Sequence, residues 1–322
     1  MRTLVTGAGG FIGGHLVKTL EQLGHKVIAV DIKPFEDWYQ FSEMSEKFVS
    51  DLKLLENAIL YTKGVDQIFN LAADMGGMGF IENNKAKCME SVLINTHLLQ
   101  AAKLNSVSKF FFSSSACVYA SFHQNKLDID PLKESDAYPA DPEDGYGWEK
   151  LFSERMCRHF QEDYGIETRV ARYHNVYGPF GTYDGGREKV PAAACRKIIR
   201  AIQNKSYELE IWGDGNQLRS FTYITDCIEG TIRLMNSNYS EPLNIGSSEM
   251  ISINDLYRTI ILVNNLPLGK FKFKHNMDAP QGVRGRSSNN QECKKVLDWE
   301  PSISIKTGIK QTFDWIAKEL NY

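Results

Sequence analysis

The chain has 322 residues, of which 42% are hydrophobic, and a formal net charge of −3 at pH 7. It contains no run of about 18 apolar residues, so we expect a globular protein of one large or two closely associated domains, with no membrane span and no electrostatic reason to bind nucleic acid. The six cysteines show no CxxC pairing, which predicts reduced thiols and no bound metal. The first residues already have the pattern of a strand, so we expect no cleavable leader and a cytoplasmic location.

The N-terminal residues form a short apolar run that leads into three glycines, Gly7, Gly10 and Gly13, and then into a helical pattern. Glycines permit a tight turn, and the start of the following helix offers free N–H groups to a pyrophosphate. A second apolar run ends in Asp31, whose carboxylate can accept the hydroxyls of an adenosine ribose. This combination predicts a dinucleotide site that prefers NAD, while Lys33 leaves NADP open.

Apolar runs typical of buried strands alternate with helical patterns through the first half of the chain. The expected strands cover residues 3–8, 26–31, 47–51, 66–73, 109–118 and 167–173. This alternation predicts an α/β fold with a doubly wound parallel Rossmann sheet, in which ligands bind at the carboxyl ends of the strands.

The second half mixes shorter strands with helices, which predicts a smaller C-terminal α/β substrate-binding region packed over the sheet edge. The expected elements are strands at 209–212 and 242–245 and helices around 192–203, 225–236, 253–264 and 305–320. We therefore expect an NAD-binding domain over residues 1–175 and a substrate-binding domain over 176–322, interwoven with the first.

Tyr146 and Lys150 are four residues apart in a helical pattern, so their side chains share one helical face. A neighbouring ammonium and a nicotinamidium charge favour a phenolate, which can serve as general base on a sugar hydroxyl while hydride leaves the same carbon. Ser115 ends an expected strand about thirty residues upstream and can supply a hydroxyl to the same oxygen. These residues predict an alcohol-oxidising site.

Cys117 follows Ser115 at the same strand end and suggests that oxidation is followed by proton transfer. The alternative is that this thiol is a small buried core residue, which is the usual position of a free cysteine. His174 has no Cys, Asp or His at ligand spacing, so we expect a structural role for it and no metal site.

Together these motifs resemble the extended short-chain dehydrogenase/reductases that act on nucleotide sugars. Longer strings resemble the GDP-mannose 3,5-epimerase family more narrowly: Asp74 to Phe80, Tyr177 to Lys189, and Gln281 to Arg286. The resemblance implies that NAD oxidises C4 of a GDP-sugar, that protons exchange at C3 and C5, and that the hydride returns. GDP-mannose would then become GDP-L-galactose or GDP-L-gulose.

The resemblance also implies roles for individual residues. Cys117 and Lys189 match the proton-exchanging pair of the family, beside the catalytic residues Tyr146, Lys150 and Ser115. The implied NAD contacts are Gly7, Gly10, Phe11, Ile12, Gly13, Asp31, Asp51, Leu71, Ala72, Tyr146 and Lys150. The implied nucleotide-sugar contacts are Gly76, Ser115, Ala116, Cys117, Asn175, Glu188, Lys189, Lys197, Gln217, Arg219 and Arg286.

Other activities stay open at this point. Related 4,6-dehydratases carry acidic residues where this chain has Ala116 and Cys117, so dehydration is disfavoured. A C4 dehydrogenase that releases the keto sugar of a GDP-hexose or GDP-heptose, or a non-catalytic NAD(H)-binding regulatory protein, would share most of the motifs. Leu218 and the Ala120-Ser121 pair depart from the family pattern and leave the identity of the sugar open.

By analogy with this superfamily we expect a homodimer built from two helices of each subunit. The apolar side chains that would either line this seam or face the protein's own sheet are Leu93, Leu98, Leu99, Leu151 and Met156.

Overall fold

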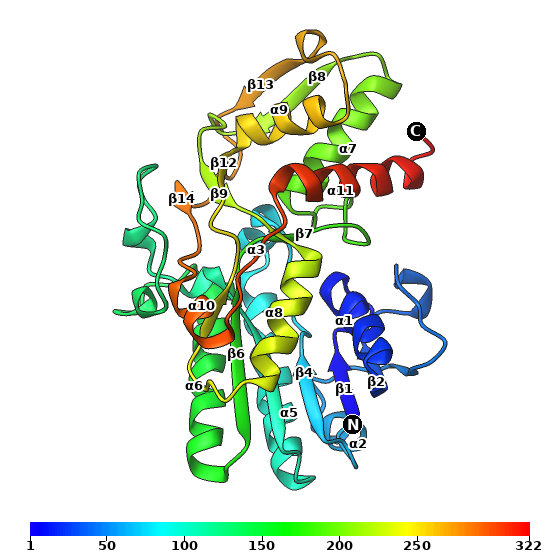
Figure 1. The fold of residues 1–322 in the computed structure, drawn as a ribbon, viewed down its shortest axis with the longest axis vertical. Helices are drawn as coiled ribbons and strands as arrows, with labels where there is room; N and C mark the ends of the chain where they lie inside the picture. The colour runs from blue at the N-terminus through cyan, green and yellow to red at the C-terminus, as the bar shows by residue number, and fades with distance from the viewer.

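The computed structural model describes residues 1–322 and is built on a seven-stranded parallel sheet (Figure 1). The strand order is β11-β6-β5-β4-β1-β2-β3, and every neighbouring pair runs parallel. The strands span Arg2–Thr6 (β1), Lys26–Asp31 (β2), Glu46–Val49 (β3), Gln67–Asn70 (β4), Lys109–Ser115 (β5), Glu167–Tyr173 (β6) and Leu243–Ile245 (β11). The order reverses at β1, which places a ligand crevice at the carboxyl ends of β1 and β4. The predicted fold class is therefore confirmed.

Helices cover both faces of the sheet. The strand residues alternate between the two faces, so Leu4 and Ile68 pack in one core while Val5 and Phe69 pack in the other. The helices around the first core are Leu55–Tyr61 (α2), Ser91–Leu104 (α5) and Tyr146–Tyr164 (α6), and those around the second are Phe11–Gln22 (α1) and Ile224–Asn236 (α8). Two short helices, Met78–Asn83 (α3) and Lys85–Met89 (α4), precede α5.

A smaller region made mainly of later residues lies beyond the carboxyl ends of the strands, in the upper part of Figure 1. Its helices are Val190–Gln203 (α7), Ile253–Val263 (α9) and Ile305–Glu319 (α11), whereas the short helix Gln291–Leu297 (α10) packs against β11 and α8 of the first region. Its strands are Val176–Tyr177 (β7), Glu208–Trp212 (β8), Leu218–Ser220 (β9), Thr222–Tyr223 (β10), Met250–Ser252 (β12), Lys272–Asn276 (β13) and Gly285–Arg286 (β14). They form three small sheets, β10-β7, β12-β9-β14 and β13-β8.

The strand expected at 242–245 belongs to the main sheet, where β11 pairs with β6, and not to the smaller region. The preceding helix α8 likewise packs against α1 and β6. The chain therefore returns to the first region after residue 223. The two domains are interwoven because α8 and β11, which come late in the chain, pack with the main sheet. The boundary at residue 175 stays a prediction.

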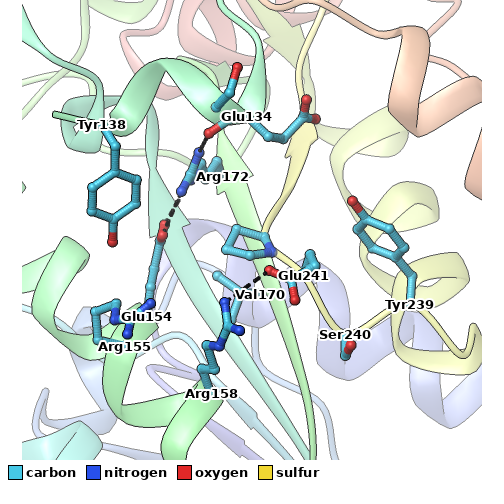
Figure 2. A pocket seen from close by; sticks show the side chains of 12 residues that line it. Glu134, Tyr138, Glu154, Arg155, Arg158, Val170, Arg172, Tyr239, Ser240 and Glu241 are labelled. Carbon is cyan, nitrogen blue, oxygen red and sulfur yellow. Dashed lines mark hydrogen bonds and ion pairs between the residues drawn. The ribbon is translucent and has the colours of Figure 1, made fainter. Parts of the chain in front are cut away.

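A buried ion pair joins α6 to β6 beside a cavity of about 450 Å³ (Figure 2). The guanidinium of Arg172 donates to both carboxylate oxygens of Glu154 at 2.9 and 2.7 Å, and it also donates to the carbonyl oxygen of Glu134 at 2.6 Å. The hydroxyl of Ser114 donates to Glu154 at 2.5 Å. The carboxyl ends of β5 and β6 are thus bonded to α6, the helix that begins with Tyr146.

The apolar residues named for a dimer seam divide into two groups. Leu98, Leu99 and Leu151 are buried in the subunit's own cores, and Met156 packs against one of these cores. Leu93 is exposed. No helix in residues 1–322 combines the length and apolar character that a bilayer crossing requires.

Candidate active site

The glycine-rich turn between β1 and α1 is closed by short backbone contacts. The N–H of Gly10 donates to the carbonyl oxygen of Gly7 at 3.0 Å, and Gly7 has a φ of +69°. A Cβ atom added to Gly13 would lie 2.1 Å from the same Gly7 oxygen. Both residues must therefore be glycine for this turn to form in front of α1.

Asp31 ends β2 beside this turn. Its carboxylate accepts hydrogen bonds from the N–H of Gly9 at 2.9 Å and from the N–H of Lys33 at 3.0 Å. Phe11 and Ile12 begin α1, while the other predicted cofactor contacts follow the carboxyl ends of neighbouring strands. These contacts are Asp51 after β3 and Leu71 and Ala72 after β4. The structure therefore gathers the predicted cofactor residues at one edge of the sheet.

Tyr146 and Lys150 lie buried in the first turns of α6. The ammonium of Lys150 is 3.5 Å from the carboxylate of Glu149, but its Nζ has no hydrogen-bond partner in the protein. Burial, followed by the charges of Cys117 and Glu149, raises the pKa of Tyr146 well above its ordinary value, against a hydrogen bond with Ser115. The protein alone therefore favours the phenol, and the phenolate expected from the sequence needs the positive charge of an oxidised nicotinamide.

These features fit NAD. The closed glycine turn leaves free N–H groups at the start of α1, and Asp31 lies at the end of the second strand. The unpartnered Nζ of Lys150 is a buried donor that ribose hydroxyls of a nicotinamide nucleoside would satisfy. The residues that would hold the cofactor are therefore present and arranged for it.

A cavity of about 340 Å³ opens beside Tyr146, between the main sheet and the smaller region. Every residue predicted to contact a nucleotide sugar lines it. These residues are Gly76, Ser115, Ala116, Cys117, Asn175, Glu188, Lys189, Lys197, Gln217, Arg219 and Arg286. They come from segments between residues 76 and 286, so the fold assembles the predicted set in one place, and their individual roles stay predictions.

Cys117 lies in the short turn that follows β5 and is 9% exposed. Its N–H donates to Ser115 Oγ at 3.2 Å, and Arg286 Nη1 donates to its sulfur at 3.5 Å. Burial and the carboxylate of Glu143 raise the pKa of the thiol to about 11, although Arg286 opposes this effect. Cys117 is thus a neutral thiol near neutral pH, in contrast to the thiolate that cationic surroundings would favour.

Lys189 is the N-cap residue of α7, at the end of the loop that precedes this helix, and it lines the cavity. Burial lowers the pKa of its ammonium, and the nearby guanidinium of Arg286 acts in the same direction. Lys189 is therefore closer to its base form than an exposed lysine would be.

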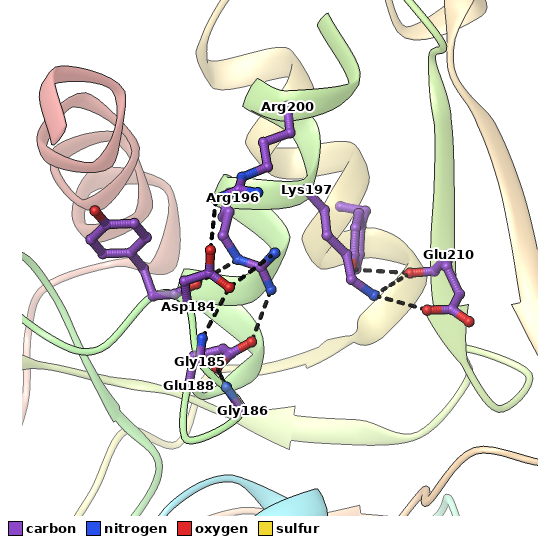
Figure 3. Close-up of polar contacts among 10 residues, drawn as sticks. Asp184, Gly185, Gly186, Glu188, Arg196, Lys197, Arg200 and Glu210 are labelled. Atoms are coloured by element: carbon purple, nitrogen blue, oxygen red, sulfur yellow. Dashed lines mark hydrogen bonds and ion pairs between the residues drawn. The ribbon is translucent and has the colours of Figure 1, made fainter. Parts of the chain in front are cut away.

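The loop in front of Lys189 is fastened to α7 by ion pairs, as Figure 3 shows. Arg196 Nη2 donates to Glu188 Oε1 at 2.8 Å, and Arg200 Nη2 donates to Asp184 Oδ2 at 2.7 Å. Lys197 Nζ donates to the carbonyl oxygen of Glu210 at 2.9 Å. The carboxylate of Glu188 thus holds the loop that carries Lys189, and α7 provides the anchor.

Another part of the cavity wall carries two arginines and an amide. Arg286 Nε donates to Gln124 Oε1 at 2.5 Å, while Arg219 donates to backbone carbonyl oxygens and has its pKa lowered to about 9 by burial. Gln217 Nε2 donates to the Trp212 carbonyl oxygen at 2.9 Å, but Gln217 Oε1 has no partner. This wall therefore combines positive charge with a free acceptor.

Glu143 is a cavity residue that the sequence analysis did not identify. Its Oε2 is 3.3 Å from Arg286 Nη2, and its N–H donates to the carbonyl oxygen of Cys117 at 2.9 Å. A single acid in the loop before Tyr146 has no motif of its own, so only the fold reveals it.

His174 lies away from any ligand set and is fully buried. Its Nε2 hydrogen-bonds to Asn244 Oδ1 at 2.8 Å, and its ring packs near Tyr119. The structure therefore places it in a polar network between β6 and β11.

Comparison with known proteins decides the family. The model of the NAD dependent epimerase/dehydratase family matches residues 3–246. The chain belongs to this family.

Two curated members of the family show the similarity over almost the full chain. The chain is 46% identical to GDP-mannose 3,5-epimerase 1 of Oryza sativa subsp. japonica, covering 99% of this chain and 82% of the relative. It is 45% identical to GDP-mannose 3,5-epimerase of Arabidopsis thaliana, covering 99% of this chain and 83% of the relative. The protein is therefore an enzyme of the epimerase/dehydratase family, and NAD is its cofactor.

A solved structure supports the fold assignment. UDP-glucose 4-epimerase of Thermotoga maritima superposes with a TM-score of 0.89 at 25% identity, over 99% of this chain and 100% of that one. The family architecture thus extends through the smaller region as well as the sheet.

Proposed function

We propose that this enzyme converts GDP-mannose into GDP-L-galactose, or GDP-L-gulose, by oxidation at C4, proton exchange at C3 and C5, and reduction at C4. The observation that carries the proposal is that Cys117 and Lys189 line the same cavity as Tyr146. The similarity to two plant GDP-mannose 3,5-epimerases supports the choice of substrate.

The oxidation step depends on Tyr146. Its phenolate would remove the proton of the C4 hydroxyl, while Ser115 at the end of β5 holds the same oxygen. Bound NAD would accept the hydride from C4 and later return it. Lys150 would orient the cofactor through the Nζ that lacks a protein partner.

The proton exchange follows from the position of the ketone. A carbonyl at C4 acidifies the C–H bonds at both C3 and C5, because each is adjacent to it. Inversion requires that a base removes a proton from one side of the carbon and an acid delivers one from the other side. Cys117 after β5 and Lys189 before α7, which come from different elements that line the cavity, would serve as this pair.

Substrate anchoring would use the charged wall of the cavity. The guanidinium groups of Arg219 and Arg286 match the geometry of a diphosphate better than an ammonium would. The free acceptor Gln217 Oε1 would accept a hydrogen bond from the nucleotide or the sugar. These contacts would hold the sugar between Cys117 and Lys189.

Deuterium incorporation tests the proposal. The NAD-loaded enzyme, incubated with GDP-mannose in deuterated water, should incorporate deuterium at C3 and C5 and form epimers without net NADH. Steady NADH production without deuterium incorporation would instead identify a C4 dehydrogenase that releases the keto sugar. An absence of turnover on any GDP-hexose or GDP-heptose would favour the non-catalytic NAD(H)-binding protein.

A pair of cysteine variants tests the role of the thiol. Cys117→Ser should still reduce bound NAD transiently but should form no epimer. Cys293→Ser is the matched control, because Cys293 is also buried but lies on α10 and does not line the cavity. Equal epimer formation by wild-type enzyme and Cys117→Ser would refute the role given to Cys117.

The assembly belongs to the same proposal. Exposed apolar side chains on α4, α5 and α6 support a homodimer through these helices, and they are Met89, Leu93, Trp148 and Phe152. Six unpaired cysteines support a cytoplasmic location, because reducing compartments keep thiols free.

A further inference from the structure

Glu143 contacts both charged and reactive groups of the cavity. Its carboxylate is 3.3 Å from Arg286 Nη2, and the same guanidinium donates through Nη1 to the sulfur of Cys117 at 3.5 Å. The N–H of Glu143 also donates to the carbonyl oxygen of Cys117 at 2.9 Å. The Glu143 carboxylate, the Arg286 guanidinium and the Cys117 thiol therefore form one connected network of contacts.

The carboxylate of Glu143 is ionised in this group. Burial raises its pKa, but Arg286 and the thiol of Cys117 outweigh burial, and the net effect is a pKa below the ordinary value. The side chain is only 16% exposed, so water screens its charge weakly. A permanent negative charge beside a thiol disfavours the thiolate.

We propose that Glu143 is a positioning residue that holds Cys117 as a neutral thiol, so that Cys117 enters the exchange as a proton donor. The raised pKa of the thiol, about 11, agrees with this role. Lys189, whose pKa burial lowers, is then the group that removes the first proton. In one inversion a C–H bond breaks, its proton goes to the Lys189 nitrogen and its electron pair to the C4 carbonyl as an enolate, and the S–H bond of Cys117 then supplies the proton of the new C–H bond. Before a second inversion the Lys189 ammonium releases its proton to solvent and the Cys117 thiolate takes one from solvent.

Several other titratable or charged groups lie near the thiol and also contribute to the electrostatics of the site. They are Tyr146 on α6, Cys88 on α4, Lys189 before α7, Arg219 on β9 and Arg286 on β14. Among the groups that affect the Cys117 pKa, Glu143 is the carboxylate with both a charge effect and a hydrogen bond. Its removal is therefore the sharpest perturbation of the thiol.

A thiolate titration tests the proposal without any substrate. Thiolate absorbance is followed against pH in the NAD-loaded enzyme, and the spectrum of the matching variant that also carries Cys117→Ser is subtracted. Glu143→Gln should move the thiolate midpoint to lower pH by about one unit. Asp144→Asn is the matched control, because Asp144 is the next acid along the chain and pairs with Lys85 at the surface.

The second arm follows turnover and rests on the proposed function. In Glu143→Gln the alkaline fall of kcat should move to lower pH together with the thiolate midpoint, while KM for GDP-mannose changes by less than about threefold. Glu143→Asp keeps the charge and should restore most of the wild-type profile. A role limited to folding the loop would change the amplitude of kcat without moving its pH dependence.

The two arms fail separately. An unchanged thiolate midpoint in Glu143→Gln would overturn the inference, whatever the turnover. A shifted midpoint with an unchanged alkaline fall of kcat would overturn the donor role of Cys117. A shifted midpoint in a protein whose wild type epimerises no GDP-sugar would refute the proposed function and leave the control of the thiol by Glu143 supported.

Discussion

The protonation of single side chains is set by burial more than by neighbouring positive charge. Cys117, Tyr146 and Lys189 share one cavity, and burial is the largest influence on the pKa of each. Because burial favours the uncharged form, it raises the pKa of the thiol and the phenol and lowers that of the ammonium. These three groups are thus shifted toward their uncharged forms, in a cavity that also holds the ion pair of Glu143 and Arg286.

Tyr146→Phe tests the base at the residue scale. Without the phenol the C4 hydroxyl keeps its proton, so we expect NAD reduction by GDP-mannose to slow by about 10²-fold or more while NAD remains bound. Single-turnover absorbance of NADH measures the rate. Tyr164→Phe is the control, because Tyr164 is exposed in the last turn of the same helix. Reduction at the wild-type rate in Tyr146→Phe would show that another group takes the proton.

At the scale of elements, the β1–α1 turn positions the cofactor. A Cβ on Gly13 would lie 2.1 Å from a backbone oxygen, so Gly13→Ala must open the turn. We expect a loss of NAD affinity of about 100-fold or more, measured by calorimetry and by the NAD content of the purified protein. Gly269→Ala is the control, because a Cβ there meets no atom within 4 Å. Retention of wild-type NAD content by Gly13→Ala would contradict this account of the turn.

Elements with a strong local signal were predictable from the sequence. The glycine turn with Asp31 and the Tyr146–Lys150 spacing each depend on neighbouring residues, and the structure forms the expected strand, turn and helix around them. The three-residue strand β11 carries no periodicity that could assign it to one sheet or another. Only the packing of α8 brings it beside β6.

The protonation states of the site residues were less predictable from the sequence than the identities of those residues. The pKa of Cys117 depends on Glu143 and Arg286, which are distant from it in the sequence and carry no motif that connects them to a thiol. A pattern of residue types can therefore identify the acid–base pair, but it cannot say which member holds the proton.

The β6–β11 junction gives the fold a pH dependence through His174. Burial lowers its pKa from 6.5 to about 3, so between these values the unfolded chain binds a proton that the folded chain excludes. The contribution of His174 to stability is therefore full above pH 6.5 and is lost progressively as the pH falls toward 3. It should account for a slope of up to about 1.4 kcal/mol per pH unit in the free energy of unfolding.

Substitution of His174 should flatten that slope. In His174→Gln the free energy of unfolding, measured by urea titration at several pH values, should fall less steeply below pH 6.5 even if its absolute value is lower. His123→Gln is the control, since His123 is exposed in a surface turn. Parallel pH profiles for wild type and His174→Gln would show that other groups cause the acid destabilisation.

For the whole molecule, the exposed apolar side chains indicate how two subunits would meet. Trp148 and Phe152 are 45% and 56% exposed one turn apart on α6, and Leu93 is 42% exposed on the neighbouring helix α5. Large exposed apolar side chains that cluster on adjacent helices are typical of an interface. Of the two alternatives that the sequence left open for Leu98, Leu99 and Leu151, the structure shows the second, because all three face the subunit's own cores.

Phe152→Glu should therefore separate the subunits. A carboxylate at this position would be buried without a partner in a dimer, so we expect the mass from sedimentation velocity to fall from about two chains to one at micromolar concentration. Leu262→Glu is the matched control, because Leu262 is equally exposed on α9, far along the chain from α5 and α6. A monomeric wild type would refute the dimer, and a Phe152→Glu dimer would place the interface on another face. Because α6 also begins with Tyr146, loss of the dimer combined with normal NAD reduction would further show that each subunit holds a complete oxidation site.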